Sequence, residues 1–181
     1  EEGFRYPEVD NKRCIQCEAC SRVCPVLHPV PVKNTAVPLT YAAINEDWEV
    51  RRKSSSGGIF YLLAEKILDA GGVVFGAGFD ENWEVCHQEV KSKEKLPKLQ
   101  TSKYVQSRME DTFQKVREEL QQERKVLFIG TPCQCGGLQN YLHQSYDNLY
   151  TADFICHGVP SPGVWRKYLK CRSKGNKISA I

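Results

Sequence analysis

The sequence predicts an α/β (α+β) protein: a mixed, partly parallel β-sheet flanked by helices, preceded by a small cysteine-rich module. Two observations predict this class. The first 28 residues hold four closely spaced cysteines and no long apolar run. From about residue 54 onward, apolar segments of strand length alternate with amphipathic segments of helix length. This alternation is typical of a sheet whose strands are joined by helices packed on its faces.

Each element follows from its own pattern. The helix expected at 59–70 has an apolar stripe, a serine before it as a cap and two glycines after it as a stop. The run at 125–130 is almost wholly apolar, as expected of a buried parallel strand. The remaining elements are a strand within 41–50, a hairpin of strands at 73–79 and 83–90, a loop at 91–107, helices at 110–123, 135–144 and 162–171, and a strand at 149–156.

The chain divides into three parts. Residues 1–28 are too short and too poor in apolar residues to build a core, so a bound metal is expected to hold them together. Residues 29–40 contain repeated prolines, which predicts an extended linker. Residues 41–181 form the α/β domain. The chain starts at Glu1 without a methionine, and we expect it to be part of a longer protein.

Composition narrows the functional class. The chain has 181 residues, 41% of them hydrophobic, and its net charge is only +3. No apolar run reaches the ~20 residues of a membrane span, and so weak a charge gives no reason to expect nucleic acid as a partner. Of the nine cysteines, four lie close together near the start of the chain and five are spread through α/β-like sequence, which favours a reducing cytoplasm over a disulfide-linked secreted protein.

The most informative motif is the cysteine run at the start of the chain. Cys14, Cys17, Cys20 and Cys24 have the spacing C-x2-C-x2-C-x3-C and are followed by proline. This is the ferredoxin spacing for a cubane 4Fe-4S cluster, in which the first three thiolates lie in one tight loop and a short helical turn carries the fourth away. A zinc site is the alternative, although structural zinc sites usually pair two cysteine knuckles across a longer loop.

A serine and glycine run precedes the first long helix of the α/β domain. Ser55, Ser56, Gly57 and Gly58 stand where a helix N-terminus offers unpaired N–H groups and a partial positive charge. Such a site suits the phosphate of a flavin or a nucleotide. An ordinary helix cap is the alternative interpretation. Neither a Walker loop nor a G-x-G-x-x-G fingerprint occurs in the chain.

Two cysteines stand at the ends of predicted strands. Thr131 and Cys133 follow the buried strand in a Gly-Thr-Pro-Cys turn, and Cys156 and His157 end the next strand. In α/β sheets, ligands bind beyond the carboxyl ends of the strands. If the two strands are parallel neighbours, Cys133 and Cys156 emerge on one edge and could ligate a second cluster or lie beside a flavin. Buried packing is the alternative role for each cysteine. His157 is expected near a flavin ring or phosphate, unless it only makes structural hydrogen bonds.

Four segments together resemble one family. KSSSGGIFYLLAEKIL, SKYVQS, VLFIGTPCQCGGL and DFICHGVPSP, behind a ferredoxin module, resemble the coenzyme F-420 hydrogenase/dehydrogenase beta-subunit family from about Glu2 to Leu169. The resemblance implies a flavin-containing iron–sulfur oxidoreductase subunit that exchanges electrons with a redox partner protein or subunit. It also implies that the family's C-terminal region continues beyond Ile181.

The resemblance also implies site residues and cofactors. It makes Ser55 to Gly58, Lys103 and Thr131 candidate FAD contacts, and it makes Cys133 and Cys156 candidate cluster ligands or flavin neighbours. One or two 4Fe-4S clusters are expected, with FAD in the full-length protein and a soluble electron acceptor such as a deazaflavin. The alternative function is a non-catalytic ferredoxin-type adaptor whose α/β domain docks a partner enzyme.

Overall fold

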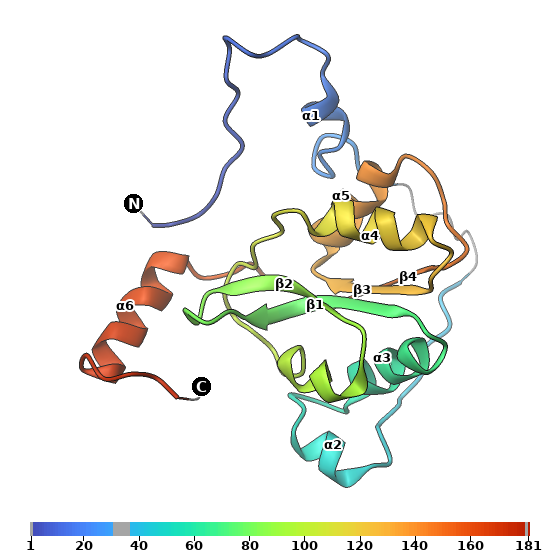
Figure 1. Cartoon of the computed structure of the whole chain (residues 1–181), viewed down its shortest axis with the longest axis vertical. Helices are drawn as coiled ribbons and strands as arrows, with labels where there is room; N and C mark the ends of the chain where they lie inside the picture. Colours follow the sequence, from blue (N-terminus) through green and yellow to red (C-terminus); the bar gives the residue numbers. More distant parts are fainter. Residues whose placement is uncertain (1, 31–36, 180) are drawn as a thin grey trace.

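The computed structural model describes residues 2–30, 37–179 and 181, so the middle of the predicted linker at 29–40 lies outside the described residues. Its elements follow the predicted alternation of helices and strands (Figure 1). They are α1 (Ala19–Arg22), α2 (Trp48–Arg52), α3 (Ile59–Asp69), β1 (Val73–Phe79), β2 (Val85–Val90), the 3-10 helix η1 (Lys93–Lys98), α4 (Thr112–Gln121), β3 (Val126–Gly130), α5 (Pro132–Leu142), β4 (Leu149–Asp153) and α6 (Pro162–Ser173).

The four strands form one mixed sheet in the order β2-β1-β3-β4. β1, β3 and β4 are parallel, and β2 returns antiparallel beside β1 as the second arm of a hairpin. β1 and β3 are the central strands, and their almost unbroken burial agrees with their Val- and Phe-rich sequences. The predicted mixed, partly parallel sheet flanked by helices is therefore confirmed.

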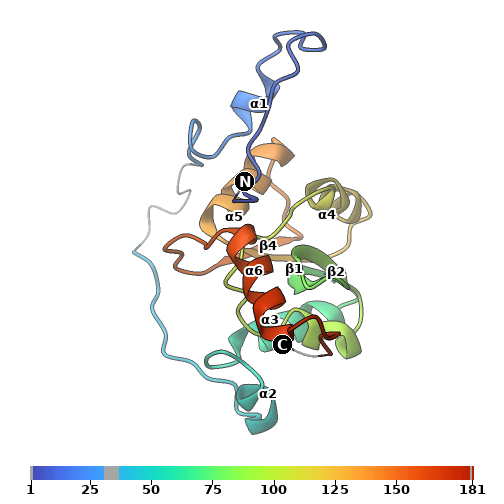
Figure 2. The ribbon, with the colours of Figure 1, turned by 90° about the vertical axis from the view of Figure 1, so that its left-hand side faces the viewer.

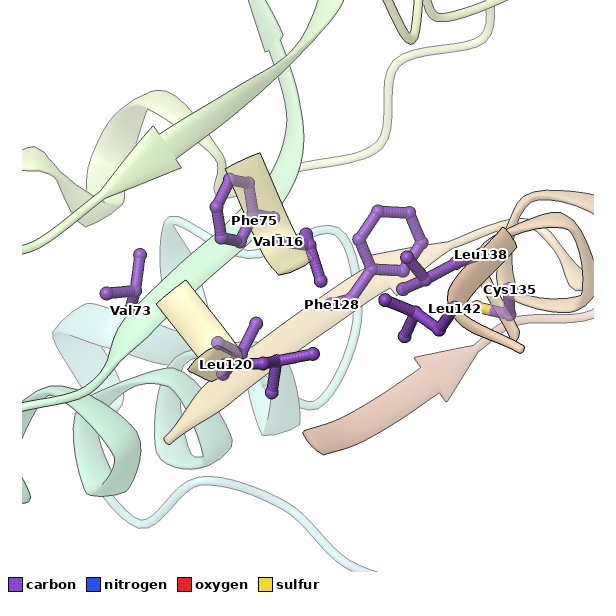
Figure 3. Packing of buried hydrophobic residues seen from close by; sticks show 9 residues of the cluster. Val73, Phe75, Val116, Leu120, Phe128, Cys135, Leu138 and Leu142 are labelled. Atoms are coloured by element: carbon purple, nitrogen blue, oxygen red, sulfur yellow. The ribbon is translucent and has the colours of Figure 1, made fainter. Parts of the chain in front are cut away.

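Helices cover both faces of this sheet (Figure 1). α4 and α5 pack on one face over Phe75 and Phe128 of the central strands, and Figure 3 shows Val116, Leu120 and Leu138 closing this core from the helices. α3 and η1 pack on the other face. Because β1, β3 and β4 are parallel, the loops that leave these strands lie along one edge of the sheet. Helix α3 runs antiparallel to β1, so the N-terminus of α3 points toward the same edge.

The cysteine-rich module lies outside the sheet, beyond α5 (Figures 1 and 2). Its one helical segment, α1, contains Cys20 and ends before Cys24, as the predicted helical turn requires. None of the α1 residues is buried. The module therefore has no apolar core of its own among the described residues, which agrees with a fold held by a bound metal.

The last helix, α6, is attached by an aromatic cluster. The ring of Trp165 stacks on Phe79 with centroids 5.8 Å apart, and its indole N–H donates to the Trp83 carbonyl at 2.7 Å. The start of the chain joins the same helix, because the Ser161 hydroxyl donates to the Glu2 carboxylate at 2.8 Å. No helix among the described residues is long and apolar enough to cross a membrane.

Several local expectations were wrong. The predicted strand within 41–50 is a coil followed by α2, because the Asp47 carboxylate accepts hydrogen bonds from the Glu49 and Val50 N–H groups and so starts a helix. α3 begins after Gly58, without a serine cap. The segment at 91–107 is mostly loop, as predicted, and also contains the short helix η1. α5 begins earlier than predicted and β4 ends earlier, at Asp153.

Candidate functional site

Cys133 and Cys156 occupy equivalent positions at the carboxyl edge of the sheet. β3 and β4 are parallel neighbours, and Gly130 is in register with Asp153. Each cysteine follows its strand's last residue by the same number of positions in the sequence. We predicted that Cys133 and Cys156 emerge on one edge if their two strands are parallel neighbours, and the strands are parallel neighbours. Both thiols are exposed. Whether they bind a cluster stays a prediction.

Cys133 belongs to the first turn of α5, where the sequence led us to expect a loop. Thr131 is the N-cap, Pro132 begins the helix, and the Thr131 N–H donates to the Gln134 side-chain oxygen at 2.9 Å in a capping box. The Thr131 hydroxyl lies 3.0 Å from the Cys133 sulfur. This turn can therefore present the exposed Cys133 sulfur to a metal or to an electron-poor ring.

Cys156 lies in the coil beyond β4. The Gly158 N–H donates to the Cys156 sulfur at 3.4 Å, and Gly158 has a positive φ of 106°. The left-handed backbone at this point suits glycine. His157, between the two, is exposed. Its predicted place near a flavin stays a prediction.

Cys135 behaves as a core residue. It is buried, its sulfur faces the Ala152 carbonyl at 3.8 Å, and it packs with the α5 face of the core. Burial, with the nearby Asp153 charge adding to it, raises the pKa of its thiol to about 12. The thiol is therefore protonated at neutral pH, in agreement with the weaker role that the sequence assigned to it.

The serine and glycine run is held by contacts with the segment that precedes it. The side-chain amide of the buried Asn45 donates to the Gly58 carbonyl at 3.4 Å, and the main-chain N–H of Asn45 donates to the Gly57 carbonyl at 2.6 Å. A Cβ on Gly57 would lie 3.1 Å from the Ala43 carbonyl oxygen. Gly58 adopts a left-handed φ of 76°. The local geometry therefore favours glycine at both positions, whether or not a ligand approaches them.

The same run is also tied to the segment at 100–103. Gln100, which is buried, donates to the Ser54 hydroxyl at 2.8 Å, and the Ser102 N–H donates to the Ser55 hydroxyl at 2.8 Å. The Lys103 ammonium donates to the Gln100 and Thr101 carbonyls at 2.7 and 3.1 Å. Desolvation lowers the pKa of Lys103 to about 8. The structure thus brings Ser55 and Lys103 together, while Ser56 is exposed beside them.

His87, which the sequence did not single out, links this segment to β3. Its Nδ1 lies 2.7 Å from the Ser107 hydroxyl and its Nε2 lies 3.1 Å from the Ile129 carbonyl. Since a carbonyl only accepts, Nε2 carries the hydrogen and Nδ1 accepts from Ser107. Burial lowers the pKa of His87 to about 4, so the ring is neutral. The segment at 100–107 thus connects the serine run to the end of β3, one residue before Gly130.

The cysteine-rich loop carries donors of the right chemistry for a cluster. Cys14, Cys17 and Cys20 are exposed thiols, and the Gln16 N–H donates to the Cys14 sulfur at 3.4 Å. Gln16 and Glu18 have left-handed backbones, which curl the loop tightly. Within residues 2–30, 37–179 and 181, no three His, Cys, Asp or Glu side chains are already gathered around one metal position. The donor set fits a 4Fe-4S cluster, and ligation by these four cysteines stays a prediction.

A broad groove of about 1340 Å³ separates the cysteine-rich module from the sheet domain. Pro25, Val26 and His28 line one side, and Cys133 and Asn140 of α5 line the other. Asn140 also donates its side-chain amide to the His28 carbonyl at 2.8 Å. The segment that follows Cys24 and one strand-end cysteine therefore face a common space.

Sequence reasoning missed the residues that assemble this region. Asn45, Gln100 and Asn140 act through hydrogen bonds to main-chain carbonyls far away in the sequence. Single polar residues of this kind carry no pattern in one sequence. His87 gives a weak signal, because a histidine buried in a strand needs partners for both ring nitrogens.

Comparisons with known proteins agree with this arrangement. Residues 7–27 match the family model "4Fe-4S binding domain". Residues 123–181 match the family model for the C terminus of the coenzyme F420 hydrogenase/dehydrogenase beta subunit, so β3, α5, β4 and α6 correspond to that part of the family. No curated protein matches the chain.

Among solved structures, the fold is similar to a chain of the F420-reducing NiFe hydrogenase complex from Methanosarcina barkeri, in a xenon-derivatised form. The TM-score is 0.58 with 16% sequence identity, and the similarity covers 75% of the present chain. The present chain spans 51% of the length of that chain.

Proposed function

Because this chain belongs to the coenzyme F420 hydrogenase/dehydrogenase beta-subunit family and begins with a 4Fe-4S module, we propose that it is an iron–sulfur flavoprotein subunit of an oxidoreductase. In this proposal, electrons pass between the cluster of the module, FAD at the carboxyl edge of the sheet and a soluble acceptor such as a deazaflavin. A redox partner subunit exchanges electrons with it. An oxygen-sensitive cluster and free thiols suit a reducing cytoplasm, where we expect the protein to act.

The observation that carries the proposal is the position of the module. The turn after Cys24 is hydrogen-bonded to α5, whose N-terminal turn holds Cys133 at the carboxyl edge where α/β sheets bind ligands. The segment that follows the last cysteine of the module therefore lies across one groove from Cys133. A module that served only as an adaptor would need no such attachment to the helix that carries Cys133.

The residues of the chain have distinct roles in this proposal. Cys14, Cys17, Cys20 and Cys24 hold the cluster, which supplies single-electron storage and transfer when bound. The N–H groups at the start of α3, with no side-chain cap from Gly58, and the exposed hydroxyl of Ser56 bind the phosphates of FAD. Lys103 adds positive charge beside them, and its lowered pKa makes that charge sensitive to pH near 8.

At the other end of the proposed FAD site, Thr131 orients the Cys133 thiol and His157 contacts the flavin. Cys133 and Cys156 either complete a second cluster or lie against the flavin ring. The Gly158 N–H donates to the Cys156 sulfur, and the Thr131 hydroxyl lies within hydrogen-bond distance of the Cys133 sulfur, so each sulfur has a polar neighbour in either role.

The proposal is tested by the cofactor content of the full-length protein purified without oxygen. We expect a flavin absorption envelope above the broad cluster absorption, FAD in the extract, and iron and sulfide in equal amounts. Cluster absorption without flavin, after reconstitution with FAD, would instead support the ferredoxin-type adaptor.

A further inference from the structure

One face of α5 contacts the cysteine-rich module directly. Gly136 and Asn140 are one helical turn apart and lie on the same side of the helix. A Cβ on Gly136 would lie 3.2 Å from the Cβ of Pro25 and 3.9 Å from a methyl of Val30. Glycine at this position therefore allows the module to approach the helix backbone more closely than any other residue would.

Asn140 attaches the module on both sides of its last cysteine. Its Nδ2 donates to the His28 carbonyl at 2.8 Å and lies 3.5 Å from the Val23 carbonyl. Between these two carbonyls, the His28 N–H donates to the Cys24 carbonyl at 2.8 Å and closes a turn. The amide of Asn140 thus holds the segment that contains Cys24 and Pro25.

In the segment after Cys24, the residues that contact α5 are more buried than their neighbours. Pro25 and Val30, which touch the helix at Gly136, are partly buried. Val26 and Leu27 between them keep 79% and 63% of their surface exposed. Only the side of the turn that faces α5 is covered, which is the pattern of a specific contact and not of a general collapse.

The same helix face continues to Cys133, three residues before Gly136 and about 4.5 Å along the axis. Pro25, Cys133, Gly136 and Asn140 all line one groove. We propose that Gly136 and Asn140 are positioning residues: they dock the iron–sulfur module on α5 and fix the Cys24–Pro25 turn beside the helix turn that carries Cys133. This inference goes beyond the proposed function, and it requires only that the module holds its cluster.

The first test is hydrogen–deuterium exchange of the full-length, cluster-containing protein. Asn140→Leu removes the amide, and we expect backbone exchange at residues 23–30 to become roughly threefold to tenfold faster, the effect of one lost hydrogen bond. Asn148→Leu is the matched control, because the Asn148 amide also donates to two main-chain carbonyls, those of Leu120 and Arg124, away from the module. It should leave exchange at residues 23–30 unchanged.

The second test uses two adjacent glycines of α5. Gly136→Ala should loosen the module, because the new methyl would press on Pro25. Gly137→Ala gains the same helix propensity, but its methyl would meet Phe113 at an ordinary 3.5 Å. Only Gly136→Ala should therefore raise exchange at residues 23–30, and Gly136→Leu should raise it further.

A third measurement distinguishes positioning from simple stability. Loosening the module exposes its cluster to water, and water stabilises the more negatively charged reduced form of the cluster. The reduction potential of the cluster should therefore rise in Asn140→Leu and Gly136→Leu. It should stay unchanged in Asn148→Leu. Unchanged exchange and unchanged potential in both docking variants would overturn the inference. Failure to bind FAD would contradict the proposed function and leave this docking test unaffected.

Discussion

The side-chain amide of Asn140 donates to the main-chain carbonyl of His28 at 2.8 Å, across 112 positions of sequence. Asn140 belongs to a helix of the sheet domain, and His28 belongs to the turn that follows the last cysteine of the iron–sulfur motif. This hydrogen bond joins two parts that the sequence separates by a proline-punctuated segment. It makes the module part of the sheet domain's surface, so the two parts are expected to act together.

Replacing Cys17 should abolish the cluster of the module. Cys17 is the middle cysteine of the C-x2-C-x2-C loop, and a cube that loses one of its loop ligands is exposed to solvent and oxygen. We expect a Cys17→Ala protein, purified without oxygen, to lack about four iron and four sulfide per chain relative to wild type. Cys171→Ala, an exposed cysteine of α6, is the control and should keep them. Equal iron in both variants would contradict the assignment.

A negative charge at Ser56 should weaken FAD binding without weakening the fold. Ser56 is exposed two positions before Gly58, the N-cap of α3. An aspartate there interacts favourably with the helix dipole, by about 0.3–1 kcal/mol, but it repels the phosphates of FAD. We expect Ser56→Asp to reduce FAD affinity roughly tenfold or more in a fluorescence titration.

The control for this prediction is Ser56→Asn, which is close in size to aspartate and uncharged. It should bind FAD within about threefold of wild type. Equal FAD affinity in the aspartate and asparagine variants would show that the phosphates of FAD do not bind at the start of α3. Gly57→Val is a poor probe of this site, because its side chain would meet the Ala43 carbonyl before any ligand.

His87 should make the protein less stable as the pH falls. Burial lowers its pKa from 6.5 to about 4, so the unfolded chain binds a proton between these values and the folded protein does not. Stability from this residue is therefore complete above pH 6.5 and declines on acidification, by about 2 kcal/mol between pH 7 and pH 5. Urea unfolding across this range should show the slope in wild type and a smaller slope in His87→Gln.

His143→Asn is the control for the pH dependence. His143 ends α5 in a left-handed conformation that asparagine tolerates, and its side chain is exposed. This variant should keep the wild-type slope. A slope that persists unchanged in His87→Gln would assign the pH dependence to other groups.

Cys135 should resist alkylation in the folded protein. Its thiol is buried and its pKa is raised to about 12, so almost no thiolate forms at pH 8. We expect iodoacetamide to modify Cys171, which is exposed in α6, and to leave Cys135 unmodified until a denaturant is added. Peptide mass spectrometry before and after unfolding measures the alkylation of Cys171 and of Cys135. Rapid native modification of Cys135 would contradict its place in the core.

The sequence by itself determined the order of the elements and the chemistry of the module. The short apolar run at 126–130 predicted a buried strand, and the cysteine spacing of residues 14–24 predicted a 4Fe-4S site. These signals are local, because the residues that carry them are neighbours along the chain. The same local signals extended β4 too far and placed Cys133 in a loop, since the capping box of Thr131 and Gln134 begins the helix earlier.

Tertiary structure alone decided which distant segments meet. Asn45 holds the glycine run, Gln100 ties the segment after η1 to Ser54, and Asn140 attaches the iron–sulfur module to α5. Each contact is one side-chain amide that satisfies a main-chain carbonyl or a hydroxyl on another element. An asparagine or glutamine with this role looks like any surface amide in the sequence, because its partner is chosen by the packing of the sheet and its helices and not by its neighbours in the chain.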